Sequence, residues 1–204
     1  MRCRLALAAD LPALADALGA AFVDDPMVRW VVGTDDAAAC RRSAAAGFFA
    51  PGLRAGLRRG HTYAGVGDGG AMTGAAIWSP PDVAMFDDAA VADLTGSLAA
   101  AAGDAALERL GAIGELVGVH HPEGRPHFYL FTLGSAARGR GLGALLVAPV
   151  LERCDADGLP AYLESSNPRN LGFYERLGFT AIWDGVPAPG GPLLTGMWRE
   201  PKPG

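Results

Sequence analysis

Residues 127–143 read His-Phe-Tyr-Leu-Phe-Thr-Leu-Gly-Ser-Ala-Ala-Arg-Gly-Arg-Gly-Leu-Gly, and this stretch decides the fold. Residues 127–133 are aromatic and almost continuously apolar, which is typical of a central β-strand that is buried on both faces. Residues 138–143 form a loop of glycine and arginine, and apolar side chains at helical spacing follow it to about Asp157. The stretch therefore predicts a strand, a tight loop and a helix in direct succession.

Strands and helices alternate through the rest of the chain, which predicts an α/β fold. The 204 residues fit one domain that spans residues 1–204. Asn167 is expected to cap the last helix and Gly178 to end it. The remaining expected elements are a strand in 2–8, a helix capped by Asp10, helical turns over 35–59 with a break at Pro51, a hairpin in 61–79, two helices in 87–118 separated near Gly103, a strand at Ala161–Ser165, a helix at 168–177, and strands near 179–184 and 193–199.

Composition argues against several classes of protein. Lys and Arg number 17 against 22 Asp and Glu, a net charge of −5 that does not suit a nucleic-acid partner. No apolar run is long enough to span a bilayer, so we expect no membrane partner. Cys3, Cys40 and Cys154 are far apart without a CxxC pair, which argues against a disulfide framework and a metal site. We therefore expect a cytoplasmic protein.

The loop between the strand and the helix has the character of an anion site. Glycines let the main chain approach a ligand closely, and the free amides at a helix N-terminus point toward a phosphate. No Asp or Glu occurs in residues 124–151, although the chain as a whole is acidic. The loop therefore predicts phosphate contacts from Arg138, Gly139, Arg140, Gly141, Leu142 and Gly143.

The residues in and after the loop limit the class of phosphate ligand that it can bind. The loop lacks the GK[ST] ending of a P-loop, which excludes a Walker-type nucleotide site. Gly139, Gly141 and Ala144 fit the loose GxGxxG/A pattern of dinucleotide-binding proteins, and Glu164 is placed to imitate their ribose-binding acid. Only 61 residues follow Gly143, too few for a complete dinucleotide fold. A fragment of a dinucleotide-binding oxidoreductase stays a minor alternative.

The loop also resembles the (Gln/Arg)-x-x-Gly-x-(Gly/Ala) signature of the GNAT superfamily of N-acetyltransferases, which residues 138–143 match fully. Residues 161–179 are similar to the corresponding stretch of puromycin N-acetyltransferases, whereas residues 20–120 diverge. The resemblance implies a mixed, twisted sheet flanked by helices, whose fourth and fifth strands splay apart around acetyl-CoA. The splayed strands would be 131–135 and Ala161–Ser165. The implied cofactor contacts beyond the loop are Leu133, Gly134, Ser135, Asn167 and Asn170.

The resemblance also implies two catalytic side chains. Tyr174 stands where similar enzymes place the general acid that protonates the sulfur of CoA, although Leu171 and Leu177 share its helix face and a core role explains it equally well. Glu164 matches the acid that accepts the ammonium proton directly or through water, or that holds a cationic acceptor. A hydrogen-bonded strand residue is the alternative for Glu164.

The sequence indicates the residues of the acceptor pocket less clearly than those of the cofactor site. Acids and aromatic rings favour a cationic amine, which makes Asp24, Asp25, Trp30, Phe48 and Trp78 candidate wall residues, with core packing as the alternative for each aromatic. His120 and His121 precede Pro122 and are expected in a surface loop.

Together these features predict an acetyl-CoA-dependent N-acetyltransferase that acts on a primary amine of a small molecule. Protein or peptide amines come second, and a non-catalytic acyl-CoA-binding sensor is an alternative of another class. No metal is expected, and either a monomer or a homodimer is compatible with the sequence.

Overall fold

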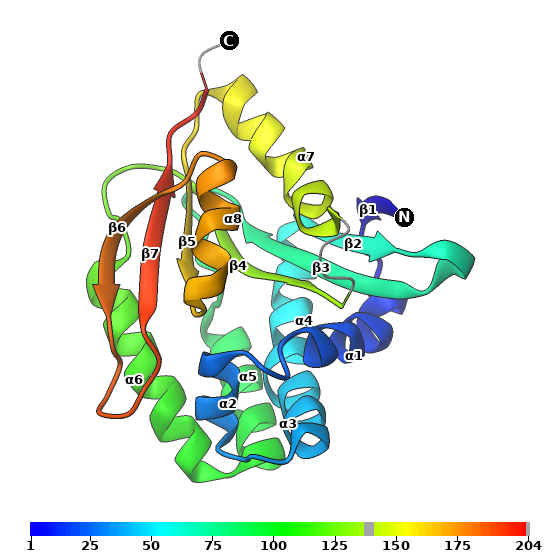
Figure 1. Ribbon diagram of the computed structural model, residues 1–204, viewed down its shortest axis with the longest axis vertical. Helices are drawn as coiled ribbons and strands as arrows, with labels where there is room; N and C mark the ends of the chain where they lie inside the picture. Colours follow the sequence, from blue (N-terminus) through cyan, green and yellow to red (C-terminus); the bar gives the residue numbers. More distant parts are fainter. Residues whose placement is uncertain (137–140, 203–204) are drawn as a thin grey trace.

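The computed structural model describes residues 1–136 and 141–202, and its centre is one seven-stranded mixed sheet (Figure 1). The strand order is β1-β2-β3-β4-β5-β7-β6, and all neighbours are antiparallel except β4 and β5. This arrangement confirms the expected α/β fold with a mixed sheet. The strands are β1 (Arg2–Leu5), β2 (Thr62–Val66), β3 (Met72–Ser79), β4 (Phe128–Ser135), β5 (Ala161–Ser165), β6 (Thr180–Gly185) and β7 (Leu194–Arg199).

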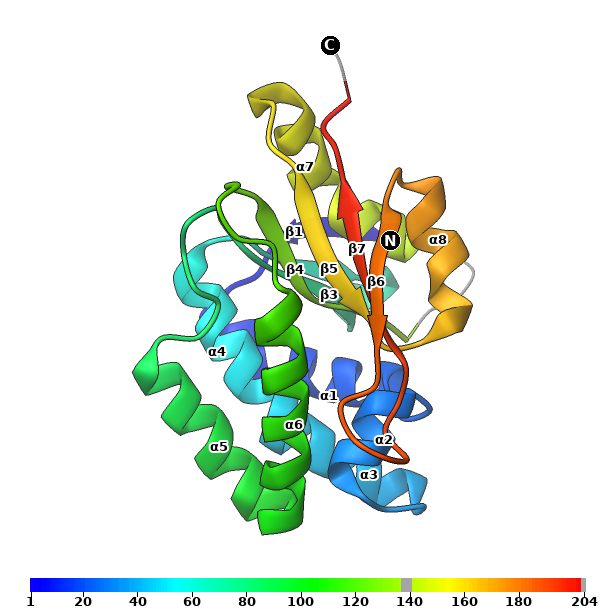
Figure 2. The same cartoon turned by 90° about the vertical axis from the view of Figure 1, so that its left-hand side faces the viewer.

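Helices cover both faces of the sheet, as the two views in Figures 1 and 2 show. On one face α7 and α8 pack on β3, β4 and β5, and on the other face α1 and α4 pack on the sheet while α3 packs on α1. No helix in the described part of the chain is long and apolar enough to cross a bilayer. The helices are α1 (Leu11–Ala21), α2 (Pro26–Val32), α3 (Ala37–Ala44), α4 (Ala50–Arg59), α5 (Asp88–Ala102), α6 (Asp104–His120), α7 (Leu142–Asp157) and α8 (Leu171–Arg176).

The predictions of where helices begin and end are confirmed at positions where one residue sets the local backbone conformation. Gly103 separates α5 from α6 with a φ of +79°, and Gly178 follows α8 with a φ of +95°, both in the left-handed region that favours glycine. The Asn167 side chain accepts a hydrogen bond from the Arg169 amide, 3.1 Å away, and so caps the turn that leads into α8.

Two local predictions are wrong. Residues 37–59 run as one continuous helical segment, because a π-helical turn at Ala45–Phe49 widens the spiral just before Pro51, whose nitrogen has no hydrogen to donate. Asp10 does not cap α1 with its side chain. Its carboxylate instead binds the Arg4 guanidinium at 2.6 and 2.9 Å and accepts from the Leu7 amide, which ties β1 to the start of α1.

The parallel pair β4 and β5 separates after three residues. Phe128 pairs with Ala161, Tyr129 with Tyr162 and Leu130 with Leu163, and the described residues show no β4–β5 pairing beyond that point. The rest of β4 continues its ladder with β3, while β5 continues its ladder with β7. The fourth and fifth strands therefore splay apart as expected.

The face of β4 turned away from α7 is only partly buried. Tyr129 and Phe131 lie on this face beside the cluster of α1 and α4, whereas a register shift in the β3–β4 ladder turns Leu133 toward the cluster of α7. The apolar run predicts a strand that is buried on both faces, and this prediction is wrong because Tyr129, Phe131 and Leu133 border a cavity.

Gly134 holds the splayed half of β4 against α1. A Cβ atom at this position would lie 2.5 Å from Phe22 Cε2 and 2.6 Å from Leu18 Cδ2. Leu18 of α1 and Phe22, which directly follows this helix, therefore occupy the space that any larger residue would need.

We expect Gly134→Ala to lower the free energy of unfolding by about 1–3 kcal/mol, the usual cost of overpacking a core. Gly96 is a matched control, because it lies on the exposed side of α5 and no heavy atom lies within 4 Å of its Cβ position. Gly96→Ala should stabilise the protein by up to about 1 kcal/mol through helix propensity alone. Urea denaturation measures both, and a Gly134→Ala protein as stable as wild type would contradict the packing argument.

Candidate functional site

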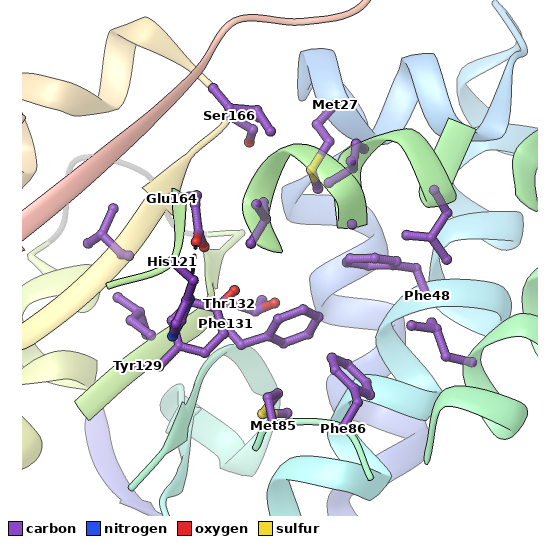
Figure 3. A pocket seen from close by; sticks show the side chains of 18 of the residues that line it. Met27, Phe48, Met85, Phe86, His121, Tyr129, Phe131, Thr132, Glu164 and Ser166 are labelled. Atoms are coloured by element: carbon purple, nitrogen blue, oxygen red, sulfur yellow. Dashed lines mark ion pairs between the residues drawn. The ribbon is translucent and has the colours of Figure 1, made fainter. Parts of the chain in front are cut away.

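A cavity of about 690 Å³ begins where β4 and β5 separate and extends toward α5 and α6 (Figure 3). Leu133 and Tyr174 line it near the separated strands, and Phe48 and Phe86 line it at the other end. Its size falls within the range of small-molecule sites.

Tyr174 lies in the core and in the cavity wall at once. Its side chain is 8% exposed, and its ring centre lies 5.2 Å from that of Phe173 and 6.0 Å from that of Phe179. Burial and then the charge of Asp25 raise the pKa of the Tyr174 phenol well above its ordinary value. The phenol therefore keeps its proton at neutral pH and can donate it.

Glu164 presents a buried carboxylate to the same cavity. Its side chain is 9% exposed, and Oε1 finds no hydrogen-bond partner among the described residues. Nδ1 of His121 lies 3.8 Å from Oε1, beyond hydrogen-bond distance (Figure 3). A buried carboxylate oxygen without a hydrogen bond is costly, so Glu164 is suited to a ligand that brings a donor or a positive charge.

Two phenols lie close to Glu164. Burial is the main cause that raises the pKa of Tyr129 and of Tyr162, and the neighbouring Glu164 carboxylate adds to it in both. The Tyr162 hydroxyl also accepts a hydrogen bond from Nε1 of Trp183 at 3.0 Å. Both phenols therefore stay protonated, and Glu164 remains the acidic group at this end of the cavity.

His120 is the last residue of α6, and His121 lies in the bend that follows it, as expected, but the His121 side chain is partly buried. His121 follows the last turn of α6, and its ring packs edge-on against Tyr129 and Tyr162 at centroid distances of 5.1 and 5.0 Å. Nε2 of His121 and Nε2 of His127 lie 3.3 Å apart, so that one of the two rings donates a hydrogen bond to the other. Burial is the main cause that lowers the pKa of His127, which favours its neutral form.

These two histidines also border a second cavity, of about 450 Å³, beside the first. His121 and Tyr129 line both cavities and so lie between them. His121 and His127 therefore connect the Glu164 carboxylate with the second cavity.

The predicted phosphate loop is partly described. Arg138, Gly139 and Arg140 lie outside the described residues. Gly141 has a φ of +74° and directly precedes the first residue of α7, Leu142, whose side chain is buried, so that only its main chain can face a ligand. A Cβ atom at Gly143 would lie 3.1 Å from Phe173 Cζ, so this glycine lets α7 approach α8.

The other predicted cofactor residues border the gap between the strands. Leu133, Gly134 and Ser135 follow the last β4–β5 pair of Leu130 with Leu163, and Leu133 lines the cavity. Asn170 also lines it, whereas the side-chain oxygen of Asn167 accepts the capping hydrogen bond.

The structure corrects the prediction for Asp25. Oδ1 accepts hydrogen bonds from the Met27 and Val28 amides, and Oδ2 accepts one from Ser166 Oγ at 2.8 Å. Asp25 therefore caps α2 and ties it to the end of β5, and it is not a residue of the cavity wall.

The predicted tryptophans do not line the cavity either. Trp78 is fully buried among residues of α7 such as Leu146, on the opposite face of the sheet. Trp30 packs on the cluster that contains Leu98 and Leu194. Phe48 is a wall residue as expected, together with Met27, Phe86 and Phe131, which the sequence analysis did not single out. The described residues contain no group of three or more His, Cys, Asp or Glu that could hold a metal ion.

Residues 80–197, more than half of the chain, match the family model described as an acetyltransferase (GNAT) domain. The chain belongs to the GNAT acetyltransferase family. It therefore carries an acetyltransferase domain, and the oxidoreductase alternative is wrong.

Curated relatives match over shorter stretches. The chain is 36% identical over 90 residues to an acetyltransferase of Agrobacterium fabrum, covering 44% of this chain and 64% of that protein. It is 38% identical over 74 residues to mycothiol acetyltransferase of Streptomyces avermitilis, covering 32% of this chain and 24% of that protein. A fission yeast protein, an uncharacterized N-acetyltransferase of Schizosaccharomyces pombe, is 43% identical over 54 residues, which cover 26% of this chain and 22% of that protein. The chain thus spans less than two thirds of the length of each of these relatives.

Solved structures agree over almost the whole chain. Histone acetyltransferase HPA2 and related acetyltransferase from Corynebacterium glutamicum is 25% identical with a TM-score of 0.70, covering 98% of this chain and 96% of that one. A polyamine N-acetyltransferase of Drosophila melanogaster, 17% identical with a TM-score of 0.62, covers 97% and 98% and shares the fold.

Proposed function

We propose that this acetyltransferase transfers the acetyl group of acetyl-CoA directly to a primary amine of a small molecule. The observation that carries the proposal is that Tyr174 and Glu164 reach one cavity at the point where β4 and β5 separate. A proton donor and a proton acceptor on one cavity suit a reaction in which an amine loses a proton and a thiolate gains one. The names of two structural neighbours, a polyamine and an agmatine N-acetyltransferase, are consistent with an amine acceptor.

The residues present fit acetyl-CoA as the cosubstrate. Beyond Leu130 the described residues of β5 no longer pair with β4, and the edge of β4 at Leu133 and Gly134 suits an extended arm that adds to the sheet. The 16-residue helix α7 begins next to Gly141 and directs the positive end of its dipole to that side of the sheet. We assign the pyrophosphate contacts to this helix start and to Arg138, Gly139 and Arg140. Bound acetyl-CoA would supply the thioester that carries the acetyl group.

Glu164 acts in this proposal as the proton acceptor. The acceptor amine must be neutral to attack the carbonyl, and the Glu164 carboxylate takes the ammonium proton either directly or through water. His121 and His127 then offer this proton a route to the second cavity.

Tyr174 completes the reaction from the other side of the site. When the bond between the acetyl carbon and sulfur breaks, the electron pair stays on sulfur, and the Tyr174 phenol donates its proton to that thiolate. The presence of both Tyr174 and Glu164 argues against a non-catalytic acyl-CoA sensor. The likeness of residues 161–179 to puromycin N-acetyltransferases, a monomeric or homodimeric state, and a cytoplasmic location without nucleic-acid or membrane partners stay predictions.

We expect the purified protein to bind acetyl-CoA and to release free CoA when a suitable primary amine is added. Isothermal calorimetry with acetyl-CoA, NAD and ATP measures the binding, and a thiol reagent measures CoA release across a panel of amines. Binding of NAD with no detectable binding of acetyl-CoA would sink the proposal.

We expect Tyr174→Phe to lower turnover by ~10²–10⁴-fold, the usual effect of losing a general acid. The phenyl ring keeps its contacts with Phe173 and Phe179, so the melting temperature and acetyl-CoA affinity should barely change. A variant that melts several degrees lower and still turns over at the wild-type rate would make Tyr174 a packing residue only.

We expect Glu164→Gln to slow turnover most at lower pH. Most of the acceptor amine is then protonated and needs a base, whereas at higher pH more of it is already neutral and the deficit shrinks. Profiles of kcat/KM against pH for the variant and wild type test this, with acetyl-CoA affinity as the control. Profiles that fall in parallel at every pH would assign Glu164 to substrate positioning instead.

A further inference from the structure

We infer that the acceptor is an amine with a single positive charge and an apolar body of about aromatic size, and that a glycine face on α6 makes room for that body. This inference rests on the proposed function and names its substrate class.

The charge distribution in the cavity supports one ammonium group and no more. Glu164 is the only Asp, Glu, Lys or Arg among the described residues that line the cavity. Its side chain is more than nine-tenths buried, and Oε1 lacks a hydrogen-bond partner in the described part of the chain. One donor with a positive charge would complete this carboxylate, and the cavity offers no second carboxylate for a second charge.

The end of the cavity away from Glu164 is aromatic. The Phe131 ring lies 5.0 Å from Phe86 and 5.6 Å from Phe48, and Phe48 lies 5.3 Å from Phe49. Figure 3 shows Phe48, Phe86 and Phe131 gathered on one side of the cavity, with Glu164 and His121 on the other. A ligand that spans the cavity therefore needs a polar head and an apolar body.

Three glycines of α6 face this space. Gly111, Gly114 and Gly118 are separated by three and four residues, so they share one side of the helix, and all three line the cavity. A Cβ atom at any of them would meet no heavy atom within 4 Å.

The empty space around these α6 glycines distinguishes them from glycines that allow two elements to pack closely. At Gly134 a Cβ atom would collide with α1, and at Gly143 it would press on Phe173. The α6 glycines therefore do not bring two elements of the fold together. Since glycine lowers helix stability, their effect is to enlarge the cavity at some cost to α6.

The same features disfavour other amines. A polyamine would place its second ammonium group among Phe48, Phe86 and Phe131 without a counter-charge, which is strongly unfavourable. A very short amine would reach Glu164 but leave the aromatic end unfilled and gain no apolar contact there.

Gly114→Leu tests the inference, because leucine favours the helix and its side chain would occupy the open space. We compare wild type with this variant on three primary amines: 2-phenylethylamine, methylamine and the triamine spermidine. Gly96→Leu is the matched control, an exposed helical glycine on α5 that does not line the cavity.

Wild type should prefer 2-phenylethylamine over both other amines in kcat/KM. Gly114→Leu should reduce the ratio of kcat/KM for 2-phenylethylamine to that for methylamine by about tenfold or more, the scale on which a pocket rejects added carbon atoms. Gly96→Leu should leave this ratio unchanged. A wild-type preference for spermidine or methylamine, an unchanged ratio in Gly114→Leu, or a change in oligomeric state on sedimentation of Gly114→Leu would overturn the inference.

Calorimetry with 2-phenylethylamine in the presence of CoA separates this inference from the proposed function. Binding to wild type that Gly114→Leu weakens, without CoA release from acetyl-CoA, would support the cavity assignment and contradict the acetyl transfer. CoA release with amines that neither bind through the aromatic end nor respond to Gly114→Leu would support the transfer and contradict the cavity assignment.

Discussion

β4 and β5 pair for only three residues, and each strand is then held on its outer side by a different partner. β4 is held at Gly134 by β3, by Leu18 of α1 and by Phe22, which follows α1. β5 is held to its end at Ser165 by the antiparallel ladder with β7. Because these two attachments draw the strands apart, main-chain groups and side chains that would face a neighbouring strand face a cavity instead. Tyr174, Glu164 and the wall of Phe131 all depend on that separation.

The site places the Glu164 carboxyl group in a largely buried position. Glu164 lies between protonated phenols and a histidine, and Oε1 lacks a hydrogen-bond partner among the described residues. Such an arrangement costs stability in the free protein and is relieved when a cationic ligand arrives. Tyr174 shows the complementary effect, since burial and the nearby Asp25 keep its proton in place. A carboxylate and a protonated phenol therefore border one cavity, where they suit the roles of proton acceptor and proton donor.

The helix α6 contributes both ends of the acceptor site. His121, at the C-terminal end of α6, lies beside Glu164. The glycine face of α6 borders the aromatic end of the cavity. The charge of Asp25 suggests contact with a cationic amine. Both of its carboxylate oxygens instead accept hydrogen bonds within the protein and join α2 to the end of β5. Position in the fold therefore decides which acids are free to meet a ligand.

The sequence by itself determined the elements whose signals are local. Glycine conformation, capping and apolar spacing within a few residues predict the strand and the helix within residues 127–157, the limits of β5, the Asn167 cap and the break at Gly103. Tyr174 and Glu164 were found through the resemblance of residues 138–143 and 161–179 to one family. Only the tertiary structure decided that Phe48 faces the cavity while Trp78 is buried beneath α7, and that His121 reaches Glu164. The reason is that periodicity shows which residues share a face, whereas what covers each face depends on elements far away in the chain.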